Sequence, residues 1–119
     1  MNILLIDDDN DTQKMIRSIA EHDGHIIRTS SSGQDGLREL RSCAAPDIVL
    51  LDIYLPDLDG YQTLNAIRAN YPKLPVVAIT AYYTEATSNE LNARGFNGFL
   101  QKPLSPTNMM SYLVGIAAL

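Results

Sequence analysis

IVLLDIYLPDLDG, residues 48–60, is the clearest structural signal in this chain of 119 residues. It begins with four consecutive large apolar residues, which is typical of a strand buried on both faces of a parallel sheet. The acids, prolines and glycine that follow are typical of a loop. The change from one to the other falls at Asp52. An ionisable side chain is therefore predicted at the protruding tip of a buried strand.

On both sides of this stretch, short apolar runs alternate with segments of helical periodicity. Strands are predicted at residues 2–6, 25–29, 47–51, 76–80 and 98–101, and helices at 12–21, 34–42, 60–70, 84–94 and 106–118. Strands that alternate with helices indicate an α/β protein with a parallel sheet covered on both faces. The first, third and fourth strands are the most apolar and should be central. The expected fold is flavodoxin-like: a doubly wound five-stranded sheet of order 2-1-3-4-5 with five helices.

Composition indicates one folded domain over residues 1–119, either standing alone or forming the N-terminal part of a longer protein. The formal net charge of −5 argues against direct binding of nucleic acid or of an anionic membrane surface. The single cysteine, Cys43, excludes an internal disulfide and is expected to be a packing residue. The sequence has no signal-peptide pattern and no apolar run near the roughly 18 residues that a membrane span needs. We expect a cytoplasmic protein.

Candidate site residues follow four of the predicted strands at their carboxyl ends. They are Asp7, Asp8 and Asp9 after the first strand, Asp52 after the third, Thr80 and Ala81 at the fourth, and Lys102 and Pro103 after the fifth. Because the carboxyl ends of parallel strands meet at one edge of the sheet, and ligands bind where the strand order reverses, these side chains should converge.

Three converging carboxylates need a cation or a proton among them. Two of them about 5 Å apart repel by roughly 3 kcal/mol at an effective dielectric near 20. Lys102 supplies one positive charge, and Mg²⁺ prefers such oxygen ligands. A metal, a lysine and a hydroxyl around one nucleophilic carboxylate are the parts of a phosphoryl-transfer site. Asp52 would attack phosphorus, Lys102 and Thr80 would bind the phosphoryl oxygens, and the small Ala81 would leave room for the group.

Over essentially its whole length the chain resembles the receiver domains of two-component response regulators. The resemblance rests on the acidic pair Asp7-Asp8, on Asp52, Pro56 and Gly60 in a D-x-x-x-P-x-x-x-G motif, on Thr80-Ala81, on Lys102-Pro103, and on Phe99 three residues before that lysine. It implies a phosphoacceptor domain that receives a phosphoryl group on Asp52 from a histidine kinase or phosphotransfer domain. Such a domain catalyses only its own phosphorylation and dephosphorylation, and is not otherwise an enzyme.

The resemblance also implies roles for single residues. Asp8 would bind Mg²⁺ or Mn²⁺ directly, Asp7 mainly through water, and Asp52 and the backbone carbonyl of Tyr54 would be further ligands. Thr80 and Phe99 would be the switch residues, and Pro103 would follow a cis peptide bond. Phe99 as a plain core aromatic is the alternative.

Partners follow from the same resemblance. The output domain or protein would contact the fourth helix, fifth strand and fifth helix, where Tyr82, Tyr83, Met109, Met110 and Tyr112 offer apolar contacts unless the methionines are core. A phosphorylation-dependent homodimer is compatible with that surface. The phosphoryl donor would dock near the first helix, at Met15. Tyr54 and Tyr82 would flank the phosphoryl group and slow its hydrolysis.

Other readings of the acidic residues exist. Asp9, Asp11, Asp57 and Asp59 are more typical of helix caps and turns than of a site. IDDDND is similar to the D-x-D nucleophile loop of haloacid-dehalogenase-type phosphatases, but Asp11 stands where those expect Thr or Val. An EF-hand calcium loop is excluded, because Thr12 stands where its turn glycine would be and Ser18 stands where its glutamate would be. A degenerate receiver that only binds a partner would lack one of the site residues, and none is missing here. A flavodoxin-like cofactor binder is a further alternative, but the acids would repel the phosphate of a flavin.

Overall fold

The computed structural model describes residues 1–42, 44–81 and 85–119. The predictions for Cys43, Tyr82 and Tyr83 lie outside these residues. The elements, in chain order, are β1 (Asn2–Ile6), α1 (Asn10–His22), β2 (Ile26–Ser30), α2 (Gly33–Ser42), β3 (Ile48–Asp52), α3 (Gly60–Asn70), β4 (Val76–Thr80), α4 (Glu85–Arg94), β5 (Gly98–Gln101) and α5 (Met109–Ala117). No helix in these ranges is both long and apolar enough to cross a membrane.

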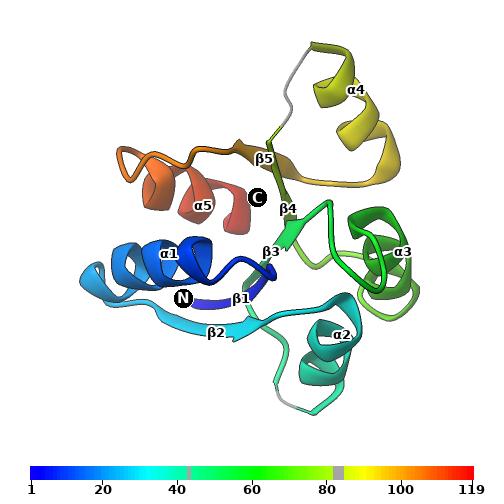
Figure 1. The fold of residues 1–119 in the computed structure, drawn as a ribbon, viewed down its shortest axis with the longest axis horizontal. Helices are drawn as coiled ribbons and strands as arrows, with labels where there is room; N and C mark the ends of the chain where they lie inside the picture. Colours follow the sequence, from blue (N-terminus) through cyan, green and yellow to red (C-terminus); the bar gives the residue numbers. More distant parts are fainter. Residues whose placement is uncertain (43, 82–84) are drawn as a thin grey trace.

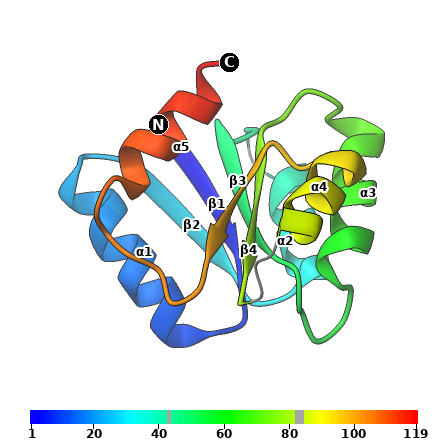
Figure 2. The same cartoon turned by 90° about the horizontal axis from the view of Figure 1, so that it is seen from above.

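The five strands form one parallel sheet in the order β2-β1-β3-β4-β5. Helices α1 and α5 cover one face, and α2, α3 and α4 cover the other (Figures 1 and 2). Figure 2 shows that the strands all run the same way, so that their carboxyl ends form one edge. The predicted fold class and strand order are confirmed.

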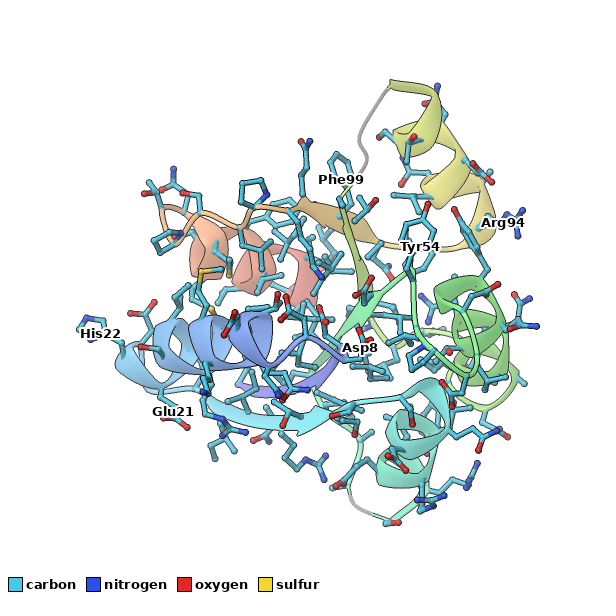
Figure 3. The ribbon with its side chains drawn as sticks, viewed as in Figure 1. Asp8, Glu21, His22, Tyr54, Arg94 and Phe99 are labelled. Atoms are coloured by element: carbon cyan, nitrogen blue, oxygen red, sulfur yellow. The ribbon has the colours of Figure 1, made fainter. Side chains whose placement is uncertain are left out.

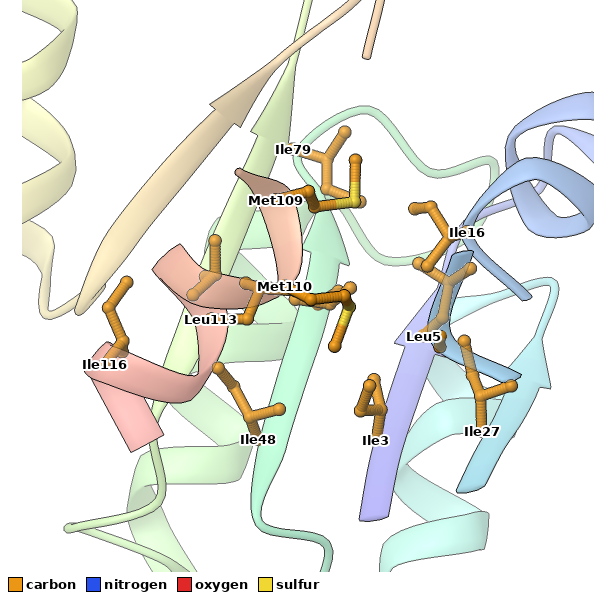
Figure 4. Packing of buried hydrophobic residues seen from close by; sticks show 13 residues of the cluster. Ile3, Leu5, Ile16, Ile27, Ile48, Ile79, Met109, Met110, Leu113 and Ile116 are labelled. Atoms are coloured by element: carbon orange, nitrogen blue, oxygen red, sulfur yellow. The ribbon is translucent and has the colours of Figure 1, made fainter. Parts of the chain in front are cut away.

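Two apolar clusters hold the layers together, one on each face of the sheet. Successive side chains of a strand point to opposite faces, so Ile3 and Leu5 of β1 enter one cluster and Leu4 and Ile6 enter the other. The first cluster lies under α1 and α5 (Figure 4). The second receives side chains from α2, α3 and α4. The central strands are therefore buried on both faces, as their unbroken apolar sequences predict.

The start of α5 differs from the prediction. The helix begins at Met109 rather than at Pro106, because Asn108 has a φ of 65° and this left-handed conformation interrupts helical geometry. Met109 and Met110 are buried in the first cluster, so the alternative that the methionines are core residues is confirmed and they do not form an output surface. Tyr112, on the same helix, is 40% exposed.

The predicted capping roles of acidic residues are confirmed for Asp9 and Asp59. Asp9 caps α1 by accepting a hydrogen bond from the backbone N–H of Asp11, which lies in the first turn of that helix. Asp59 caps α3 in a reciprocal capping box with Gln62. These caps are local, and each satisfies backbone groups that a helix start leaves without partners.

Gly60 is needed at the start of α3 because the chain folds back tightly on β3. Its N–H donates to the carbonyl of Ile53 at 2.7 Å, and a Cβ at this position would lie 2.5 Å from Ile53 Cα and 2.9 Å from the carbonyl oxygen of Asp52. Both obstacles are backbone atoms and cannot rotate away. We expect Gly60→Ala to lower the free energy of unfolding by about 2 kcal/mol, as overpacking in a close-packed site does.

Gly115 provides the matched control. It lies within α5, and a Cβ there meets no atom within 4 Å. Gly115→Ala should raise the free energy of unfolding by about 0.5–1 kcal/mol, because alanine is the better helix former. Urea denaturation of both variants measures the two changes. Equal effects would show that Gly60 does not occupy a sterically closed position.

Candidate functional site

The carboxyl ends of β1, β3, β4 and β5 bring the predicted polar side chains together. Asp7 is fully buried, while Asp52 and Thr80 are 5% and 2% exposed. Asp52 is the last residue of β3 rather than a residue beyond it, so the prediction that it protrudes is wrong. Asp8, by contrast, is exposed at the end of β1 (Figure 3). The site is a recessed acidic pocket with Asp8 at its opening.

Lys102 neutralises part of this charge from the end of β5. Its Nζ lies 3.2 Å from Asp52 Oδ2, to which it donates a hydrogen bond, and 3.3 Å from Asp7 Oδ2. Its backbone N–H donates to the carbonyl of Thr80 at 2.7 Å, which ties the lysine to the neighbouring strand end. Partial burial works against the charge of Lys102, but the two carboxylates outweigh it and hold the pKa above its usual range.

The charge of the buried Asp7 carboxylate is only partly offset by its neighbours. Burial raises its pKa to about 6, the carboxylate of Asp52 adds to the rise, and a hydrogen bond from the Asp9 N–H and the charge of Lys102 oppose it. Within the described part of the chain its buried Oδ2 accepts no hydrogen bond, and its contact with the Lys102 ammonium at 3.3 Å is an ion pair. A buried carboxylate oxygen without a hydrogen-bond donor is a place where a cation fits.

Three carboxylates are close enough to share that cation. Oxygens of Asp7, Asp8 and Asp52 all lie within 4.8 Å of one another. The backbone N–H of Tyr54 donates to Asp52 Oδ1 at 3.0 Å, which holds the start of the following loop against this carboxylate. An all-oxygen donor set suits a hard divalent ion such as Mg²⁺ or Mn²⁺. The residues present therefore fit a divalent metal, and the carbonyl of Tyr54 as a further ligand stays a prediction.

The other predicted residues lie on the strands and loops that surround the acidic residues. Ala81 is exposed directly after β4, and the Lys102–Pro103 peptide bond is cis, as the resemblance implies. The side chain of Tyr54 is 63% exposed and lies on the side of α4 (Figure 3). Phe99 is half-buried on β5 and packs against the second apolar cluster, so it combines core contacts with access to solvent.

Phe99, one of the two predicted switch residues, makes a contact that was not predicted from the sequence. The hydroxyl of Tyr112 on α5 accepts a hydrogen bond from the backbone N–H of Phe99 at 3.1 Å. Strand β5 is at the edge of the sheet, so this hydroxyl serves an N–H that has no further strand beside it. Nothing in the periodicity of α5 signals it, because the bond joins a side chain to a backbone group of another element.

Comparison with known proteins shows which family this fold and site belong to. The family model of the response regulator receiver domain matches residues 3–114. The receiver domain of NtrX from Brucella abortus superposes with a TM-score of 0.89 at 30% identity, covering 98% of each chain. The chemotaxis protein CheY4 of Vibrio cholerae has the same fold, with a TM-score of 0.87 at 22% identity and 97% of each chain covered. The chain belongs to the response regulator receiver domain family of two-component systems.

Relatives of different lengths share this domain. A 14.6 kDa protein of Leptolyngbya boryana is 32% identical over 92% of this chain and 85% of its own length. The transcriptional regulatory protein ZraR of Escherichia coli is 31% identical over 95% of this chain, which spans only 25% of ZraR. NtrX of Azorhizobium caulinodans is likewise matched over 24% of its length, at 30% identity and 92% of this chain. The chain corresponds to the receiver portion of these longer regulators.

Proposed function

We propose that this domain accepts a phosphoryl group on Asp52 and uses it to change the surface formed by α4, β5 and α5. The observation that carries the proposal is the position of Asp52 at the end of β3. Its carboxylate lies 3.2 Å from the Lys102 ammonium and within 4.8 Å of oxygens of Asp7 and Asp8. That is the arrangement phosphoryl transfer to a carboxylate requires: a nucleophile, a fixed cation and a set of metal ligands.

The residues divide the chemistry between them. A carboxylate oxygen of Asp52 attacks phosphorus of a phosphohistidine, the new O–P bond forms as the N–P bond breaks, and the donor histidine leaves. Lys102 stabilises charge on the phosphoryl oxygens, and Thr80 donates a hydrogen bond to one of them. Asp7, Asp8, Asp52 and the carbonyl of Tyr54 would hold Mg²⁺, which supplies charge neutralisation on the same oxygens.

The proposed partners are a phosphoryl donor and an output. The donor is a histidine kinase or phosphotransfer domain docking beside α1, where Met15 is half-buried and shares a pocket with Lys102 and Leu104. The output is a domain or protein that contacts α5 and β5, where Tyr112 and Val114 are 40% and 44% exposed. Phosphorylation adds up to two negative charges beside Thr80, and Phe99 would then turn inward. Beyond its own phosphorylation and dephosphorylation, we propose no catalysis by this domain.

The test is an intact mass measurement after incubation with acetyl phosphate, with and without Mg²⁺. We expect the mass of one phosphoryl group to be added to the wild type only when Mg²⁺ is present, and none to Asp52→Asn. Addition to the Asn variant would place the acceptor elsewhere. If the wild type gains no mass from acetyl phosphate and none from a phosphohistidine donor, the proposal is contradicted.

A further inference from the structure

The loop that follows the acceptor, residues 53–59, is anchored at both of its ends by local contacts. Gly60 N–H donates to the carbonyl of Ile53 at 2.7 Å, which closes the loop on itself. Asp59 caps α3 and so fixes the end of the loop to that helix. These two contacts join residues close in sequence. They do not fix how the middle of the loop lies against the rest of the domain.

Leu55 in the middle of the loop packs against the second apolar cluster, and Asp57 adds a polar contact to a different helix. Its Oδ1 accepts from the backbone N–H of Gly33 and its Oδ2 from that of Gln34, both at 3.0 Å. These N–H groups belong to the first turn of α2, where backbone donors have no partners within the helix. Desolvation works against the charge of Asp57, but the N–H groups of Gln34, Leu58 and Gly33 outweigh it and hold the pKa below its usual range.

Close packing supports the same contact. A Cβ on Gly33 would lie 2.5 Å from the Thr63 hydroxyl oxygen of α3 and 3.0 Å from Leu58 Cβ of the loop. The start of α2 therefore touches both the loop and the helix that follows it. A glycine there lets the helix approach closely enough for Asp57 to reach its N–H groups.

We propose that Asp57 is a positioning residue for the metal site, acting by clamping the acceptor loop onto the N-terminus of α2. The inference rests on the proposed function, because the loop carries Tyr54, whose carbonyl is a proposed metal ligand three residues before Asp57. Without the clamp the loop has to be ordered when the metal binds, and that entropic cost weakens binding. Asp57 itself touches neither the metal nor the phosphoryl group.

The test is titration of the unphosphorylated domain with Mg²⁺ by calorimetry, for the wild type, Asp57→Ala and Asp57→Asn. Outer residues that orient metal ligands typically contribute about 10–100-fold in affinity. We expect Kd to rise about tenfold in Asp57→Ala and about threefold in Asp57→Asn, which keeps one acceptor oxygen. At saturating Mg²⁺ the rate of phosphorylation by acetyl phosphate should return to within about twofold of the wild type, because Asp52 and Lys102 are untouched.

Asp35→Ala is the matched control. Asp35 lies in the first turn of α2, the helix start that Asp57 contacts, and carries the same charge as Asp57, but it pairs with Arg38 of its own helix at 2.7 Å. Its removal should leave the Mg²⁺ affinity unchanged. If Asp57→Ala and Asp35→Ala bind Mg²⁺ with equal affinity, the clamp is overturned. If Asp57→Ala does not fold, wild-type Mg²⁺ affinity in Asp57→Asn would overturn it instead. A wild type that binds no Mg²⁺ would overturn the proposed metal site as well, so the two failures are distinguishable.

Discussion

Replacing Arg68 by leucine should lower the free energy of unfolding by about 3 kcal/mol, although Arg68 is not one of the residues of the acidic pocket. Its guanidinium leaves the last turn of α3 and donates to the carbonyls of Tyr71 and Leu74 and, across the molecule, to the carbonyl of Gly95 and to Asn97 Oδ1. Hydrogen bonds from a charged donor contribute about 1.5–3 kcal/mol each when buried, and less at this half-buried position. Burial lowers the pKa of Arg68, yet a guanidinium stays charged.

The fork-shaped, planar guanidinium of Arg68 makes lysine a poor replacement. A single ammonium cannot reach acceptors on both sides as the planar guanidinium does, so Arg68→Lys should recover less than half of the loss. Arg38→Leu is the control, since Arg38 pairs with Asp35 of its own helix and its side chain is 66% exposed. Arg38→Leu should lower the free energy of unfolding by less than about 0.5 kcal/mol. Urea denaturation of the three variants decides the point: similar losses for Arg68→Leu and Arg38→Leu would mean that the fork does not hold α3 to the turn before β5.

Long-range contacts of this kind mark the limit of what the sequence predicts. Periodicity locates strands and helices, and parallel strands place their carboxyl ends together, so the convergence of Asp7, Asp8 and Asp52 follows from the order of the elements. Arg68 and Asn97 are 29 residues apart, and Asp57 and Gly33 are 24 apart. Nothing in the local pattern relates them, because their contacts exist only after the helices have packed.

Two further differences have local physical causes that the residue types conceal. Proline in a first turn favours a helix start at Pro106, but the left-handed Asn108 delays the helix to Met109. An acid after an apolar run suggests a protruding side chain, whereas Asp52 completes the strand and is covered by its surroundings. Burial changes the chemistry of such acids, since it raises the cost of each charge until a cation offsets it.

That cost gives Asp7 opposite effects on stability and on metal binding. Its folded-state pKa of about 6 lies above the ordinary value of 3.8, so the folded state binds this proton more tightly than the unfolded state does. In the absence of metal, the contribution of Asp7 to stability is therefore most unfavourable above pH 6 and is relieved as the pH falls towards 4. Asp7→Asn should raise the free energy of unfolding of the metal-free domain by roughly 2 kcal/mol at pH 7, and by about 1 kcal/mol less at pH 5.

Adding Mg²⁺ should reverse that order, because a ligand that binds only the folded state stabilises it. The wild type should gain thermal stability with increasing Mg²⁺ at pH 7, while Asp7→Asn, which has lost a carboxylate of the pocket, should gain little. Thermal unfolding of both proteins at pH 5 and pH 7, with Mg²⁺ or with EDTA, measures all four differences in one set. If Asp7→Asn is no more stable than the wild type in EDTA at pH 7, the buried charge is not a cost. If Mg²⁺ stabilises Asp7→Asn as much as it stabilises the wild type, Asp8 and Asp52 hold the ion without Asp7.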